Sequence, residues 1–102
     1  MVIVLFRSKT TQAAGDDYAK MAGELVARAK TLPGFVDLTA YRHQDGEDLL
    51  VIRWQDMETL KAWTDDTRHV IAQRLGREKW YQYSKVEVAE VARSYGFERP
   101  AS

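Results

Sequence analysis

Two runs of consecutive apolar residues, at positions 2–6 and 49–52, do most to constrain the fold of this 102-residue chain. Each run is far too short to cross a bilayer, so each is predicted to be a β-strand. Side chains alternate between the two faces of a strand, and every position in these runs is apolar, so both faces need a cover. A bare apolar face of that size is rare on a monomer.

A long amphipathic helix is predicted to follow the first strand, after a polar segment at residues 8–15. Asp16 or Asp17 is expected to cap the helix, and Pro33-Gly34 is expected to stop it. Apolar side chains recur at steps of three and four and form one stripe, as in a helix that packs on a sheet. The stripe consists of Tyr18, Met21, Ala22, Leu25, Val26, Ala29 and Leu32.

The middle of the chain is typical of a hairpin. Residues 35–42 and 48–54 have strand character, and Asp45-Gly46 between them is a strong turn signal. Asp56 is predicted to cap a short helix, and Asp65, Asp66 and Thr67 offer a cap for the next one, which Gly76 is expected to end. The residues predicted to face inward from these helices are Met57, Leu60, Trp63, Val70, Ile71 and Leu75. Residues 80–93 form the last predicted strand.

The predicted order is β-α-β-β-α-α-β, with no internal repeat or linker, so residues 1–102 are interpreted as one domain. This order is typical of the ferredoxin-like split βαβ fold of the α+β class, in which helices cover one face of an antiparallel sheet. Because the helices can cover only one face, a second copy of the chain is expected to cover the other. The sequence therefore predicts a homodimer.

Composition excludes several classes of function. Fifteen basic and fifteen acidic residues are interspersed and cancel, which disfavours binding to nucleic acid or an anionic membrane. The chain has no cysteine, so disulfides, thiolate catalysis and sulfur-based metal sites are excluded. The first residues lack the basic segment and cleavage site of a secretion signal, so a cytoplasmic location is expected.

Trp63 and His69 are the residues that best indicate a function. A tryptophan on an inward helix face and a histidine at the start of the next helix could line a small apolar pocket with a polar group. The positive end of the helix disfavours the imidazolium form of His69, which keeps a neutral base available. Core packing alone explains Trp63 equally well, while Trp54 and Trp80 are expected in the core or an interface.

These features together resemble the antibiotic-biosynthesis monooxygenase family, whose members are dimeric α+β barrels. The resemblance covers nearly the whole chain, and it lies in Pro33-Gly34-Phe35, in Trp54 with Asp56, in Trp63 and His69, and in Gly76-Arg77 before Trp80, Tyr81 and Tyr83. It implies a monooxygenase that uses no metal and no flavin. The implied substrate is an aromatic, quinol or polyketide-like compound that reacts with dioxygen once it is deprotonated.

The resemblance also implies roles for individual residues. His69 and Tyr83 are the candidate catalytic residues, and Trp63 is a candidate pocket wall. Thr59 stands where the polyketide-oxidising branch tends to have an asparagine. Arg53 is predicted either to pair with an acidic side chain, Asp37 or Glu87, or to stabilise an anionic substrate.

Two alternatives to an oxygenase remain at this stage. One is a dimeric module that binds a small hydrophobic ligand without turnover. The other is a haem-binding or haem-degrading protein, which is disfavoured because the haem-degrading branch relies on an asparagine and this chain contains none. A metal site is not expected, since neither His43 nor His69 has a partner at the ligand spacing of a helical metal site.

Overall fold

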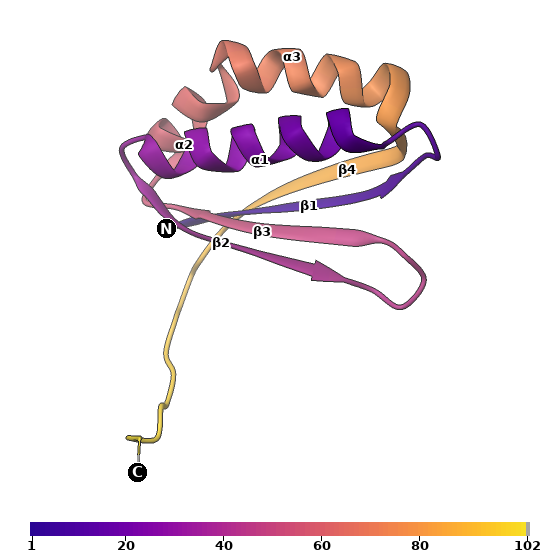
Figure 1. Cartoon of the computed structure of the whole chain (residues 1–102). Helices are drawn as coiled ribbons and strands as arrows, with labels where there is room; N and C mark the ends of the chain where they lie inside the picture. Colours follow the sequence, from indigo (N-terminus) through magenta and orange to yellow (C-terminus); the bar gives the residue numbers. More distant parts are fainter. Residues whose placement is uncertain (102) are drawn as a thin grey trace.

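The computed structural model describes residues 1–101, with only the backbone described for Thr67, and it shows one helical layer on one face of a four-stranded sheet (Figure 1). The elements in chain order are β1 (Val2–Thr10), α1 (Asp16–Thr31), β2 (Phe35–Arg42), β3 (Asp48–Trp54), α2 (Met57–Thr64), α3 (Thr67–Leu75), the π-helical turn η1 (Gly76–Trp80) and β4 (Tyr81–Glu90).

The strands lie in the order β2-β3-β1-β4, and every neighbouring pair is antiparallel. Since β3 lies between β1 and β2, the unit formed by β1, α1 and β2 is a split βαβ. The predicted ferredoxin-like α+β fold is confirmed. No helix among residues 1–101 is long and apolar enough to cross a membrane.

The main core lies between the sheet and the helices. Directly paired residues share a face of the sheet, so Val4 and Ile52 project to the same side, together with Leu38. Trp54 is fully buried there, with no exposed surface. The other buried members of the main core are Val2, Ala29, Leu60 and Trp63. This core confirms that Leu60 and Trp63 face inward from α2.

Several predicted details at the helix ends are wrong. Neither Asp16 nor Asp17 caps α1: the capping position is Gly15, which has no side chain to offer. Met57 was expected to face inward but is about half exposed. The first strand also continues to Thr10: β3 pairs with it as far as Ser8, which is buried, and β4 pairs with it as far as Thr10.

The prediction for α3 is wrong in its orientation at Val70 and Ile71, and its end is confirmed. Val70 and Ile71 are exposed, whereas the small residues Ala72 and Gly76 are buried. The α-helix ends at Leu75 with Gly76 as its C-cap, and the chain then continues through one π-helical turn to Trp80. A β-carbon at Gly76 would lie 2.5 Å from the ring of Tyr81, so the close approach, and not a turn, requires glycine.

The face of the sheet away from the helices carries a second set of apolar side chains. Ile3, Leu5, Leu49 and Val51 alternate with core residues on the two central strands, so they project to this side. We call this surface the open face. Its existence confirms that both central strands are apolar on their two faces. The last strand ends at Glu90, earlier than predicted, and the chain then leaves the body as an extended segment (Figure 1).

Candidate functional site

Trp63 and His69 meet between the helices and the sheet, as part of a continuous group of rings. The two ring centroids lie 4.0 Å apart, and the planes are tilted by 51°. On its other side Trp63 lies 5.6 Å from Trp54, which contacts Phe35 edge to face at 5.7 Å. We call Phe35, Trp54, Trp63 and His69 the aromatic–histidine cluster. It brings residues of β2, β3, α2 and α3 together.

Three nitrogen atoms in this cluster are buried and have no hydrogen-bond partner among the described residues. They are Nε1 of Trp54, Nε1 of Trp63 and Nδ1 of His69. Buried polar atoms are normally paired, and leaving one unpaired costs about 1–3 kcal/mol. Two tryptophan N–H donors and one imidazole nitrogen are therefore left without a partner in the interior of one copy.

The first turn of α2 fixes the position of Trp63. The Thr59 amide donates to Oδ1 of Asp56 at 2.8 Å, and the Thr59 hydroxyl donates to the Asp56 carbonyl at 3.0 Å. The Asp56 amide points back at the same hydroxyl, which completes a capping box. Thr59 also packs directly against the backbone of Gly34, whose φ is +86°. The structure thus uses the Thr59 hydroxyl in the helix cap.

A partly buried ion pair holds the start of α3 beside α1 and acts on His69. Asp66 caps α3 by accepting from the Arg68 amide at 3.0 Å, and it also accepts from Nε of Arg28 at 3.2 Å. Partial burial alone would raise the pKa of Asp66, but these hydrogen bonds outweigh it and lower the pKa. Burial lowers the pKa of His69 below its ordinary value of 6.5, and the charge of Asp66 partly opposes that shift. His69 is therefore neutral at pH 7.

We expect an NMR titration to show how burial and the charge of Asp66 act in opposite directions on the pKa of His69. The chain has two histidines, and His69 should titrate below pH 6.5 because burial disfavours its charged form. Asp66→Asn keeps a capping oxygen but removes the charge, so the midpoint of His69 should move further down. The other histidine, His43, is exposed beside Asp45. A midpoint for His69 at or above 6.5 would contradict the assignment.

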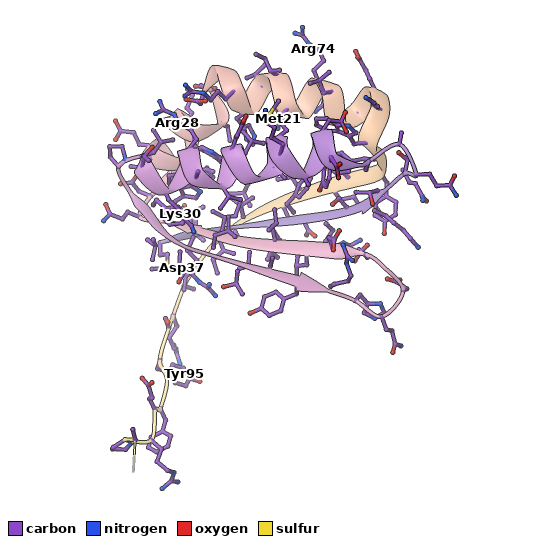
Figure 2. All side chains as sticks on the ribbon, viewed as in Figure 1. Met21, Arg28, Lys30, Asp37, Arg74 and Tyr95 are labelled. Atoms are coloured by element: carbon purple, nitrogen blue, oxygen red, sulfur yellow. The ribbon has the colours of Figure 1, made fainter. Side chains whose placement is uncertain are left out.

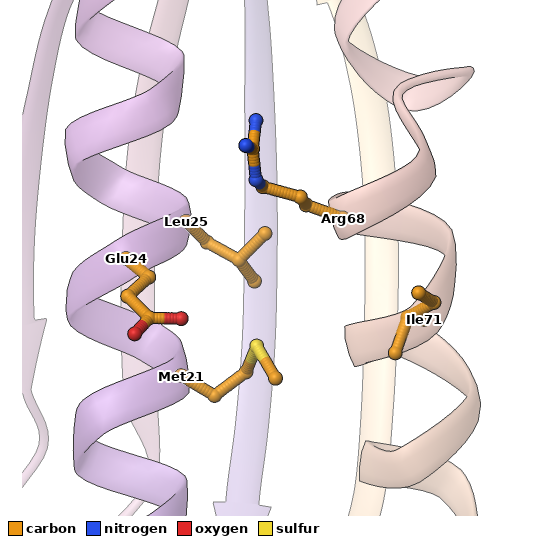
Figure 3. Close-up of a pocket in the computed structure, with 5 residues that line it drawn as sticks. All are labelled: Met21, Glu24, Leu25, Arg68 and Ile71. Atoms are coloured by element: carbon orange, nitrogen blue, oxygen red, sulfur yellow. The ribbon is translucent and has the colours of Figure 1, made fainter.

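Two clefts open on the helical layer, and Trp63 and His69 line neither of them. The first lies between α1 and α3 and is lined by Met21, Glu24, Leu25, Arg68 and Ile71. Figure 3 shows Met21 and Leu25 of α1 and Arg68 of α3 projecting into the gap between the two helices. Its volume of about 120 Å³ is below the 300 Å³ or more of a typical ligand pocket. The second, of about 320 Å³, lies around Arg74 on the outer surface of α3 and η1.

Tyr83 and Arg53 lie on the other side of the sheet from the aromatic–histidine cluster. Arg53 lies opposite Ile3 in the register of β1 and β3. Its side chain donates a hydrogen bond at 3.1 Å to Asp37, one of its two predicted acidic partners. The Tyr83 hydroxyl donates to Glu47 at 2.6 Å, and this bond raises the pKa of Tyr83. Within one copy, the structure brings together Trp63 and His69 but not Tyr83 or Arg53.

Sequence reasoning missed the pairing of Arg28 with Asp66, which lie 38 positions apart. Arg28 stands off the apolar stripe of α1, so its position indicated only a solvated side chain. The cap at Asp66 was visible in the sequence, but nothing in it identified the partner. Among the described residues, no group of three or more histidine, cysteine, aspartate or glutamate side chains gathers as metal ligands would.

A sequence profile of the antibiotic biosynthesis monooxygenase family matches residues 1–75. The chain therefore belongs to this family. A relative of known sequence is the uncharacterized protein YqjZ of Bacillus subtilis, which is 33% identical over 81 residues. That match covers 79% of this chain and 71% of the relative.

Solved structures share the fold at much lower sequence identity. A Mycobacterium tuberculosis protein superposes with a TM-score of 0.80 at 16% identity, covering 93% of this chain and 98% of that one. SnoaB of Streptomyces nogalater, a cofactor-independent oxygenase, gives a TM-score of 0.74 at 16% identity, covering 91% of this chain and 94% of SnoaB. At these identities the likeness shows the fold alone.

Proposed function

We propose that the protein is a monooxygenase that oxidises a small phenolic or quinol-type compound with dioxygen and needs neither metal nor flavin. The observation that carries the proposal is the aromatic–histidine cluster, in which two tryptophan nitrogens and one nitrogen of a neutral histidine are buried without a partner. Membership of the family and the fold shared with a cofactor-independent oxygenase support it.

In this proposal His69 is the base. Neutral imidazole takes the proton of the substrate hydroxyl, and a nearby tryptophan N–H stabilises the anion that forms. The anion is electron-rich enough to reduce dioxygen itself. One oxygen atom enters the substrate, and the other leaves as water with two hydrogens of the substrate, so no external reductant is needed. The surrounding rings exclude water, which strengthens these interactions.

The binding elements are those that meet at the cluster. Trp63 is the wall against which an aromatic ring stacks, and the half-buried imidazole of His69 presents the polar end. The cleft between α1 and α3 lies next to this position, because Arg68 lines the cleft and His69 follows it on α3. We propose that this cleft widens to admit the substrate, since its lining residue Met21 is unbranched and adaptable.

Oxygen uptake tests the proposal. Protein treated with a chelator and free of flavin should accelerate oxygen consumption by at least one member of a panel of hydroquinones and polycyclic phenols. Buffer and heat-denatured protein provide the blanks. Protein that is inactive until iron or flavin is supplied would refute the cofactor-independent mechanism.

A binding module without turnover is the second candidate, and one observation favours it. Of the four residues in the cluster, only His69 can exchange a proton near neutral pH. If phenols bind tightly, as quenching of tryptophan fluorescence would report, yet oxygen uptake stays at the blank rate, the binding module is correct. A spectral titration with hemin separates both candidates from a haem-binding protein.

We further propose that the protein works as a homodimer in which two open faces pack together. Ile3, Leu5, Leu49 and Val51 form the apolar centre of this face, and no helix of the same copy covers them. Obligate dimers bury more than roughly 2,000 Å² in total. Light scattering at micromolar concentration should give twice the mass of one chain, and a stable folded monomer would contradict this proposal.

A further inference from the structure

The segment after β4 exposes two aromatic side chains. Residues 91–101 extend away from the body of the protein, and Tyr95 lies on this segment (Figures 1 and 2). Tyr95 and Phe97 are 87% and 81% exposed. In an extended chain, residues two positions apart project to the same side. Tyr95 and Phe97 therefore present one largely exposed apolar edge, although the guanidinium of Arg99 in the same copy lies over the Phe97 ring, 5.7 Å from its centroid. We call residues 91–101 the arm.

A second apolar surface is left uncovered at the edge of the sheet. Val86 and Val88 pair with Phe6 and Val4, so they project toward the helical side. They are nevertheless 54% and 47% exposed. The arm of the same copy cannot cover them, since it runs from the end of β4 away from the helices (Figure 1).

The direction and length of the arm fit a second copy stacked on the open face. The arm leaves on the side of the sheet that the helices do not cover (Figure 1). Packed sheets lie about 10 Å apart. At about 3.3 Å per residue, Tyr95 and Phe97 lie roughly 16 and 23 Å beyond Glu90. That distance carries both rings past the sheet of the second copy, to the level of its helical side.

We infer that the arm is exchanged between the two copies, with Tyr95 and Phe97 packing on Val86 and Val88 of the second copy. The inference rests on the proposed dimer and adds to it, because the arm would clasp the partner beyond the contact between the sheets. The exposed aromatic rings of each arm would then cover the exposed valines of the other copy. Two-fold symmetry would produce this contact twice in the dimer.

Cross-linking between copies tests the exchange. Because the chain has no cysteine, Tyr95→Cys provides a unique attachment point for a benzophenone photo-cross-linker. Dimers reassembled from ¹⁴N- and ¹⁵N-labelled protein distinguish cross-links within a copy from those between copies. The exchange predicts mixed-isotope cross-links to β4 peptides that contain Val86 or Val88. A dimer with cross-links only within one copy, or with none, overturns the exchange while the dimer stands, and a monomer overturns both.

Dissociation of the dimer provides a second measurement. Replacing both aromatics, Tyr95→Ser with Phe97→Ser, should raise the dissociation constant at least ten-fold in sedimentation experiments, and Val86→Ser with Val88→Ser should do the same. Met57→Ser is the matched control, because Met57 is an exposed apolar residue on α2, away from the arm. Arm variants that dissociate no more readily than this control would overturn the inference.

Discussion

Replacing His69 by alanine is expected to lower the rate of substrate oxidation by at least ten-fold while the protein stays folded. A positioned general base is worth about 10²–10⁴ in rate. The free energy of unfolding should fall by only about 1–2 kcal/mol, since His69 is half-buried. Its Nδ1 is unpaired, so the substitution breaks no hydrogen bond at that atom. Oxygen uptake and a thermal melt on the same preparation separate the two quantities.

Two further variants isolate the proton transfer from the packing of the ring. His69→Phe keeps an aromatic ring against Trp63 but has no nitrogen, so it should lose as much activity as the alanine variant. Tyr83→Phe removes a hydroxyl on the open face, where it bonds to Glu47, and should leave the rate within two-fold. If His69→Phe retains activity, the histidine acts through packing, and the base must be sought elsewhere.

Gly34→Ala is expected to be strongly destabilising, although it adds only one methyl group. The residue has a φ of +86°, which costs an L-amino acid about 1–2 kcal/mol. The added carbon would also overlap the Thr59 side chain, and overpacking of this kind costs about 1–3 kcal/mol. Together these predict a fall in melting temperature of about 10 °C or more for a domain of this size.

Gly23→Ala is the matched control. Gly23 lies inside α1, and no other atom lies within 4 Å of the position that its β-carbon would take. Alanine is favoured over glycine in a helix by about 1 kcal/mol, so this variant should melt at a slightly higher temperature. If Gly34→Ala melts within two degrees of the unmodified protein, then the contact between Gly34 and Thr59 does not hold α2 in place.

The pattern of apolar and turn residues predicted the fold well, because these patterns depend on residues that are close together in the sequence. The hairpin strands were predicted with the bounds that the structure shows, since Asp45-Gly46 and the β-branched residues around Val51 act over a few positions. The orientation of α3 was not predictable in this way. The buried positions are Ala72 of α3 and Gly76 directly after it, whose small size allows close packing. The more hydrophobic Val70 and Ile71 are exposed.

The candidate site was predictable only in part for a similar reason. Trp63 and His69 lie six positions apart on consecutive helices, so their proximity followed from a short turn. Arg28 and Tyr83 are positioned by contacts across the fold: Arg28 meets Asp66 through the packing of α1, and Tyr83 is directed to the open face by the register of β4 with Lys9. No local pattern encodes which face of the sheet a strand presents to the helices.

An anaerobic crystal structure with a bound hydroquinone would show whether His69 contacts the substrate, because exclusion of oxygen prevents turnover. We expect the aromatic ring to lie against Trp63 and a phenolic oxygen to lie within about 2.6–3.2 Å of a ring nitrogen of His69. The indole nitrogen of Trp54 or Trp63 should donate to an oxygen of the same ligand. A hydroquinone bound on the open face beside Tyr83 and Arg53, with the aromatic–histidine cluster closed, would contradict this expectation.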